Sequence, residues 1–420
     1  MKHPSTRIGA AAVLIAALSL TAVGAANATT VSSAESSTAV VDSTTTDFYS
    51  TPSVLPANNG DIIRTQPSVF YLDPLKTIKA QASVTRIMYR STGSHGEATA
   101  VTGTVLVPTA AWLGKGPRPL VSYAAGTQGL NDSCAPSRQM AVGGEYEGTF
   151  IAGLLTRGYS VVVTDYQGLG TDGMHNYMSR ASQGHAVLDA ARAAKRLGSA
   201  NILPTAPVAI AGYSQGGGAS ASAAELAPEY APEINLKGAY AGAVPAELSA
   251  VAKNLDGGAY GAFLGYALIG LSADYGVNFN NYLNQAGKDR MAAIATQCTI
   301  AAVANNAFMN TATMTVSGQK VSSLVGQAEF SSIITEQTIG NRRVPRVPVL
   351  LSHSVLDDVI PYKVGVDLAK RWCAQGANLY FDTTGGPTHI GGYVAAAPAA
   401  FAFLEQRFAG TPTVSNCWLY

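Results

Sequence analysis

One short stretch, residues 206–225, constrains the fold of this chain more than any other. An apolar run at residues 207–211 is followed by Gly-Tyr-Ser-Gln-Gly at residues 212–216, and then by small residues that suit a helix. This order of strand, sharp turn and helix is typical of a nucleophile elbow, in which a serine hydroxyl is exposed on a strained turn. Small neighbours are needed there because larger side chains would collide with the facing strand and helix. The stretch predicts that Ser214 is a nucleophile.

The five residues alone do not separate a nucleophile elbow from a glycine-rich turn in an α/β sheet. Glycine supplies 43 of the 420 residues, so the pattern can arise by chance. The strand-like run before it and the helix-compatible run after it favour the elbow. The rest of the chain must then supply a base, an acid and oxyanion donors.

Composition narrows the class of protein. With a formal net charge of +1 and 13% charged residues, the chain lacks the excess of positive charge that is typical of nucleic-acid-binding proteins. Its length allows one large domain with an insertion, or two domains. No cysteine pair or histidine cluster has the spacing of metal ligands, so we expect neither a metal nor a cofactor.

The N-terminus predicts export. Lys2 and Arg7 precede an apolar run at residues 8–23, and Ala-Asn-Ala at residues 26–28 fits a signal-peptidase site. We expect residues 1–28 to be a cleaved signal peptide; a membrane anchor is the alternative, disfavoured because the run is short and a polar segment follows. Residues 29–46, rich in Ser and Thr, predict a flexible linker. The mature protein is expected to be secreted.

The cysteine count fits that prediction. An even number in an exported chain suggests two disulfides. Three pairings are possible, and sequence spacing does not choose among them. The four cysteines are Cys134, Cys298, Cys373 and Cys417.

Alternation of strands and helices predicts an α/β fold. Because the strands are nearly all apolar, we expect a mainly parallel central sheet covered on both faces, with its first part in residues 47–245. The predicted strands are 84–89, 98–107, 120–124, 159–164 and 207–211, and the predicted helices are 150–155 and 182–197.

The pattern changes after residue 242. Residues 246–341 are mostly helix-compatible and predict an inserted helical cap; ordinary extra core is the alternative. Within them, residues 260–275 are apolar and almost uncharged, and residues 291–309 predict another helix. The second part of the core, residues 342–420, predicts a strand at 347–351, a helix at 364–375, a strand at 378–381 and a closing helix at 396–408.

A serine hydroxyl needs a base and a group that orients the base. In an α/β-hydrolase the chain order is serine, acid, histidine. Asp357 and Asp358 follow the strand at 347–351, at the sheet edge where ligands bind. We favour Asp357; Asp358 remains the alternative, and either could simply form a turn. Among the six histidines only His389 both follows the acid and lies in a loop before the last helix. His353 precedes the acid, so we expect a structural or supporting role for it.

Two donors are needed for the oxyanion. One is expected to be the backbone N–H of Gln215, directly after the nucleophile. The other is expected from the loop after an early strand, where Thr127 follows the strand at 120–124. Its hydroxyl could contribute as well.

Taken together, these motifs resemble the secretory lipase family, which includes the fungal lipase A type. The resemblance covers nearly all of the chain beyond the signal peptide. It rests on Phe48-Tyr49 with residues 60–64, the loop at residues 126–129 with Cys134, residues 165–170, the elbow, residues 357–361, Thr388-His389 and the C-terminal stretch ending at Cys417.

The resemblance implies an α/β-hydrolase fold with a helical cap and a triad of Ser214, Asp357 and His389. It also implies disulfides Cys134–Cys298 and Cys373–Cys417, the first of which would staple the oxyanion loop to the cap. Members of the family hydrolyse acylglycerols and simpler carboxylic esters.

The sequence therefore predicts a secreted serine ester hydrolase that acts on lipid or other ester substrates, with a lipid–water interface as a possible partner. The apolar segment at residues 260–275 favours a hydrophobic acyl pocket, and so a triacylglycerol lipase. A short-chain carboxylesterase or an acyltransferase with the same triad is the alternative. A non-catalytic binding protein on a hydrolase scaffold is disfavoured because no triad member is missing.

Overall fold

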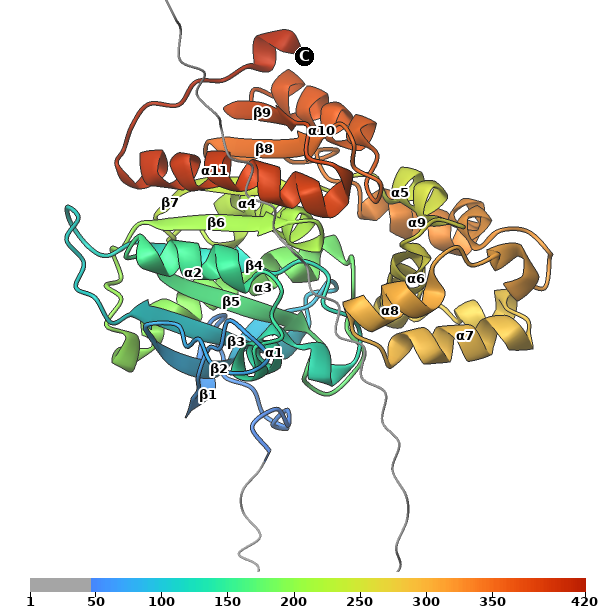
Figure 1. The fold of residues 1–420 in the computed structure, drawn as a ribbon, viewed down its shortest axis with the longest axis horizontal. Helices are drawn as coiled ribbons and strands as arrows, with labels where there is room; N and C mark the ends of the chain where they lie inside the picture. The colour runs from blue at the N-terminus through green and yellow to red at the C-terminus, as the bar shows by residue number, and fades with distance from the viewer. Residues whose placement is uncertain (1–46) are drawn as a thin grey trace, which may run out of the picture. The chain divides into compact units, whose positions relative to one another are not determined.

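The computed structural model describes residues 47–420, so the predicted signal peptide and linker lie outside the described residues. Nine strands form one sheet in the order β1-β2-β3-β5-β4-β6-β7-β8-β9 (Figure 1). The strands are β1 (Ile62–Pro67), β2 (Ala82–Thr92), β3 (Ala98–Pro108), β4 (Leu120–Ala124), β5 (Ser160–Gln167), β6 (Val208–Tyr213), β7 (Leu236–Gly242), β8 (Val349–Ser354) and β9 (Leu379–Thr384).

The sheet is mainly parallel, which confirms the predicted fold class. From β5 to β9 every neighbouring pair is parallel, whereas β1, β2 and β3 pair antiparallel with one another and β3 pairs antiparallel with β5. Every residue of β4 and β6 is buried. Parallel strands of this kind are apolar throughout because helices cover both of their faces.

Alternate strand residues point into two separate cores. Val162 and Ile210 belong to a core with α3, α4 and α10, whereas Val161 and Ala209 belong to one with α2 and α11. The two-residue period of the strand produces this division. The helices that flank the sheet are α1 (Pro136–Val142), α2 (Gly148–Thr156), α3 (Arg180–Arg196), α4 (Gln215–Tyr230), α10 (Tyr362–Ala374) and α11 (Thr388–Phe408).

Between β7 and β8 the chain forms helices that gather at one end of the sheet, drawn in yellow to orange in Figure 1. This is the segment that the sequence predicts as a cap, and its action as a cap stays a prediction. None of the helices in residues 47–420 has the length and apolar character needed to cross a membrane. The helices are α5 (Leu248–Leu255), α6 (Gly261–Tyr275), α7 (Gln285–Ala295), α8 (Thr299–Asn306) and α9 (Ala328–Glu336).

The single helix predicted over residues 291–309 is wrong. The chain leaves α7 at Ala295 and begins α8 at Thr299. Between them Cys298 is bonded to Cys134 and pairs with Gly129, and the N–H of Thr299 donates to Gln128 O at 2.9 Å. These ties to a loop of the sheet domain break the helix.

The second disulfide joins Cys373 to Cys417, so both pairings are those that the resemblance implies.

The closing helix begins earlier than predicted. It begins at Thr388 rather than at residue 396, so His389 lies in its first turn and not in a loop. Two glycines and Pro398 weaken the helical pattern of the sequence there. The first two turns form because His389 and Gly392 are buried and Tyr393 packs against both cores, and this packing outweighs the local propensity.

Candidate active site

Ser214 lies on a strained turn between β6 and α4. Its φ is 61° and its ψ is −122°, a backbone conformation that residues other than glycine rarely adopt. A Cβ on Gly216 would lie 2.0 Å from Ala124 O, and a Cβ on Gly212 would lie 2.5 Å from the same oxygen. Glycine is therefore required on both sides of the serine. This is the geometry that a nucleophile elbow needs.

Asp357 and His389 form a buried acid–base pair. Asp357 Oδ2 lies 2.8 Å from His389 Nδ1, and Oδ1 accepts the N–H groups of Val359 and Ile360 at 2.9 and 2.8 Å. Burial raises the pKa of Asp357, but the hydrogen bond and charge of His389 outweigh it, so its pKa lies below the usual range. An ionised Asp357 can orient the imidazole and stabilise its charged form.

The two aspartates have different contacts. Asp357 contacts the imidazole ring, whereas Asp358 Oδ1 accepts the backbone N–H of His389 at 2.8 Å. The sequence favours Asp357 but does not decide between the two. The geometry gives Asp357 the position of the orienting acid, and Asp358 that of a cap on the first turn of α11.

Tyr213 links the elbow to His389. Its hydroxyl donates to His389 O at 2.9 Å, and the two rings lie 5.0 Å apart. His389 Nε2 is buried and makes no hydrogen bond to any residue in 47–420, so no bond joins it to Ser214 in this structure. An unpaired ring nitrogen beside the elbow is the acceptor that a general base presents, and such bonds are often long before substrate binds.

Both expected oxyanion donors are backbone N–H groups without partners among the described residues. Gln215 begins α4, whose first N–H groups point out of the helix. Thr127 is buried in the loop after β4, and its hydroxyl lies 2.6 Å from that of Tyr177. Since Tyr177 engages the hydroxyl, the N–H of Thr127 is the better candidate.

His175 and Tyr177 form part of the site that the sequence analysis did not find. The side-chain amide of Gln215 donates to His175 Nε2 at 3.0 Å, and His175 Nδ1 lies 2.9 Å from Gln167 O. Burial lowers the pKa of His175 to about 4, so the ring is neutral and can accept from Gln215. The only sequence signal was its position soon after the loop at residues 165–170.

His353 lies near the same Asp357 oxygen that His389 contacts. Its Nε2 lies 2.9 Å from Ile360 O and 3.6 Å from Asp357 Oδ2. Burial lowers the pKa of His353, which favours the neutral ring. This position fits the supporting role that the chain order predicts.

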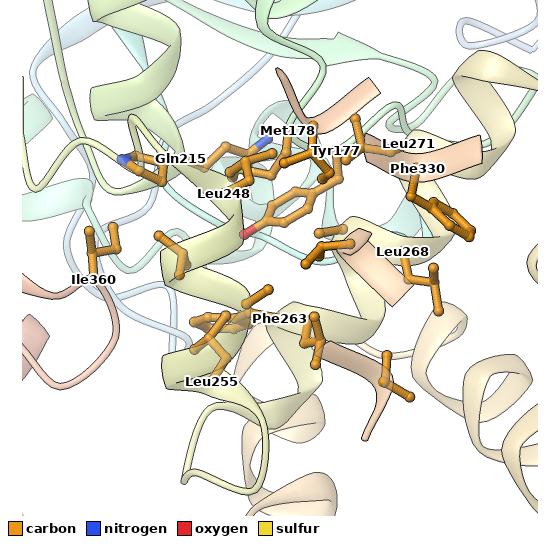
Figure 2. A pocket seen from close by; sticks show the side chains of 18 of the residues that line it. Tyr177, Met178, Gln215, Leu248, Leu255, Phe263, Leu268, Leu271, Phe330 and Ile360 are labelled. Carbon is orange, nitrogen blue, oxygen red and sulfur yellow. The ribbon is translucent and has the colours of Figure 1, made fainter. Parts of the chain in front are cut away.

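An apolar cavity begins at the elbow and extends between the helices of residues 246–341. In Figure 2, Gln215 and Ile360 lie on the left of the cavity lining, and Leu268 and Phe330 lie on the right. A cavity of this composition suits a hydrocarbon chain and excludes water. Its lining includes Ser214, Gln215, Tyr177, Met178, Leu248, Val251, Leu255, Phe263, Leu264, Leu268, Leu271, Leu324, Phe330, Ile333 and Ile360. Across residues 47–420, no cluster of His, Cys, Asp or Glu has the geometry to hold a metal.

Comparison with known proteins places this chain in a family. Residues 135–416 match the sequence model of the family described as secretory lipase. Lipase 6 of Candida albicans is 30% identical over 405 residues, covering 88% of this chain and 82% of that protein. The solved structure of Candida antarctica lipase A in its closed state is similar, with a TM-score of 0.76, 25% identity and coverage of 88% and 87% of the two chains.

Two further matches bear on activity and fold. A Mycobacterium tuberculosis relative, 29% identical over 81% of this chain and 76% of its own length, is named a probable inactive lipase. The rice cell wall degrading esterase LipA of Xanthomonas oryzae shares the fold, with a TM-score of 0.69, 20% identity and coverage of 85% and 100% of the two chains. The matches identify a carboxylic ester hydrolase, and the chain belongs to the secretory lipase family.

Proposed function

We propose that this chain is a secreted triacylglycerol lipase that cleaves carboxylic esters through Ser214, His389 and Asp357. One observation carries the proposal: an apolar cavity begins at Ser214 on its strained turn, and the Asp357–His389 pair contacts the same elbow through Tyr213. The serine is the nucleophile, the histidine the base and the aspartate the group that orients the base.

The reaction proceeds in two acyl transfers. His389 Nε2 accepts the Ser214 proton as Oγ attacks the ester carbonyl, and the same proton passes to the leaving alcohol as the carbon–oxygen bond breaks. Water then attacks the acyl-enzyme, giving its proton to His389, which returns it to Ser214 as the fatty acid leaves. In both steps the N–H groups of Gln215 and Thr127 hold the negative oxygen.

The apolar cavity favours long acyl chains. Its lining side chains are almost all hydrocarbon, and the helices of residues 246–341 would act as a cap over a chain bound there. Around the triad, Leu356, Ile390 and Val394 are more than half exposed, which suits contact with a lipid surface. Activity on emulsified long-chain triacylglycerol should therefore exceed activity on soluble short-chain esters. A preference for the short-chain esters would identify a carboxylesterase instead.

A fluorophosphonate probe tests the nucleophile directly. The purified protein should take the label on Ser214, located by mass spectrometry, and the label should require His389. Ser214→Ala should abolish ester hydrolysis and leave the circular dichroism spectrum unchanged. Ester hydrolysis that persists in the variant would refute the triad.

Export is proposed on two grounds. Residues 1–28 have the pattern of a signal peptide, and two disulfides join cysteines that would stay reduced in a cytosol. Intact-mass measurement of the protein from culture medium should show a chain that begins at residue 29. A chain that retains residue 1, or that stays with the cells, would contradict export.

A further inference from the structure

Two buried glutamates lie beside the site but take no part in the proposed reaction. Glu145 and Glu147 belong to the turn between α1 and α2 and are 7% and 2% exposed. Within residues 47–420 neither forms an ion pair with a lysine, arginine or histidine. Buried carboxylates without a cation are costly to the folded state, so their retention needs a reason.

The turn holds the oxyanion loop residue by residue. Three consecutive residues of one segment bond three consecutive residues of the other, in antiparallel order. The N–H of Gly126 donates to Glu147 Oε2 (2.7 Å), the hydroxyl of Tyr146 donates to Thr127 O (3.0 Å), and the side-chain amide of Gln128 donates to Glu145 Oε1 (3.1 Å).

Two further hydrogen bonds hold the turn and the loop in place. Glu145 Oε1 also accepts the backbone N–H of Glu147 at 3.1 Å, so the Glu145 side chain holds the backbone at position 147. The hydroxyl of Thr299 also donates to Thr127 O, at 2.6 Å. Thr127 O is thus bonded by two hydroxyls, whereas the N–H of Thr127 has no backbone partner among the described residues.

The glutamates share an environment that disfavours two negative charges. Burial raises the pKa of both, to about 7 for Glu145 and well above the usual range for Glu147, where the neighbouring Glu145 adds to the effect. In the part of the chain that the structure describes, no lysine, arginine or histidine is ion-paired with either glutamate. The titratable groups around it are Tyr123 on β4, Asp165 and Tyr166 on β5, Tyr240 on β7, Tyr393 on α11, and Tyr146 itself.

We propose that Glu147, supported by Glu145 and Tyr146, is a positioning residue that fixes the Thr127 N–H for the oxyanion. The proposal rests on the role given above to Thr127. The loop needs a hydrogen-bond acceptor at position 147, but that acceptor does not have to be charged. A neutral amide that accepts the same bond from Gly126 should therefore do the work of the carboxyl group.

Variants at Glu147 test this in steady-state hydrolysis of a soluble ester such as p-nitrophenyl butyrate. Glu147→Ala should lower kcat by about 10- to 100-fold and leave KM within about twofold, because an oxyanion donor acts in the transition state. Glu147→Gln should restore kcat to within about threefold of wild type. It should also remove any decrease of kcat that accompanies ionisation of the pair above pH 7.

Tyr146→Phe is a milder second variant that tests the same loop if Glu147→Ala folds poorly. Tyr146 is 46% exposed, so losing its hydroxyl leaves the core intact, and kcat should fall several-fold. Asp189→Asn is the matched control: it neutralises a buried carboxylate away from the site and should leave kcat unchanged. Equal kcat for wild type, Glu147→Ala and Tyr146→Phe, or equal losses in the Ala and Gln variants, would overturn the positioning role.

Ser214→Ala in the same assay separates the two proposals. Activity that persists in this variant overturns the triad and the positioning role together. Activity that is lost in Ser214→Ala but unaffected in Glu147→Ala overturns only the positioning role.

Discussion

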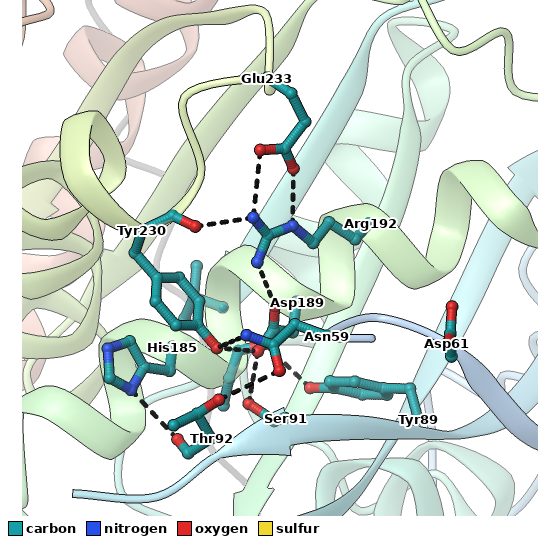
Figure 3. A network of polar contacts seen from close by, with 12 residues as sticks. Asn59, Asp61, Tyr89, Ser91, Thr92, His185, Asp189, Arg192, Tyr230 and Glu233 are labelled. Carbon is teal, nitrogen blue, oxygen red and sulfur yellow. Dashed lines mark hydrogen bonds and ion pairs between the residues drawn. The ribbon is translucent and has the colours of Figure 1, made fainter. Parts of the chain in front are cut away.

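Two buried acidic clusters in this protein differ in how their charge is compensated. In the first, Asp189 on α3 accepts bonds from Ser91, Tyr230 and Arg192 at 2.7, 2.6 and 2.7 Å. Figure 3 shows Arg192 between Asp189 and Glu233, which it also binds. In the second, Glu145 and Glu147 have hydrogen bonds but no lysine, arginine or histidine partner within residues 47–420. Asp189 is therefore paired with a guanidinium, whereas the two glutamates are not.

This difference in charge pairing indicates that one cluster stabilises the fold and the other serves the candidate active site. The Asp189 cluster joins β2, α3 and the end of α4, and no part of it lines the apolar cavity. Its charges are paired in the way that a stable interior requires. The glutamate pair bonds the loop that carries Thr127. Burial raises the pKa of Asp189 as well as those of the glutamates, so the clusters differ in the guanidinium partner and in the loop that they hold, and not in the direction of the pKa change. Replacing members of each cluster, and of the triad, should therefore affect activity and stability separately.

Asp357→Asn should give the largest effect, on activity alone. An asparagine still accepts the loop N–H groups but cannot stabilise the imidazolium, so kcat should fall by about 10⁴-fold. Asp358→Asn is the matched control, since its side chain contacts only the backbone N–H of His389 and should change kcat by less than about tenfold. Kinetics of both variants on one soluble ester measure this. A greater loss in Asp358→Asn would reverse the assignment.

Asp189→Asn should affect stability and not activity. It leaves the Arg192 guanidinium buried with only Glu233 as a carboxylate partner, at a cost on the order of 3 kcal/mol in the free energy of unfolding. Asp367→Asn, which breaks an exposed pair with Lys363, should cost less than about 1 kcal/mol. Urea unfolding of both variants gives these free energies. A loss of kcat in Asp189→Asn, under conditions in which the variant is fully folded, would show that the Asp189 cluster also contributes to activity.

Much of the fold follows from local patterns in the sequence. Short apolar runs such as residues 120–124 and 207–211, each followed by turn residues, predict buried strands, and the structure has strands at Leu120–Ala124 and Val208–Tyr213. The failures lie where distant contacts decide. The break at Cys298 depends on a disulfide to a residue 164 positions away, and the early start of α11 depends on packing against the sheet. Neither signal is local, so no window of sequence contains it.

The candidate site divides in the same way. Ser214 and His389 follow from a motif and a chain order, which a sequence displays. The choice between Asp357 and Asp358 depends on which carboxylate reaches the imidazole ring, and only the three-dimensional path of the loop after β8 decides that. Glu145 and Glu147 read in the sequence as ordinary residues of a polar turn. Their burial and their bonds to the loop at residues 126–128 arise from tertiary packing.

The smallest expected effect is a change in how stability depends on pH. The raised pKa of Glu145 means that, between its ordinary 4.5 and about 7, the folded state binds more protons than the unfolded state. The free energy of unfolding should therefore fall as pH rises through that window. Glu145→Gln removes this titration and should lessen the fall, measured by urea unfolding at pH 5 and pH 7, while the raised pKa of Glu147 maintains the remainder. Glu405→Gln, at a half-exposed side chain paired with Arg157, is the control and should keep the wild-type slope. Equal slopes in wild type and Glu145→Gln would mean that Glu145 takes up no proton in the folded state over this range, and the contrast between the two clusters would be lost.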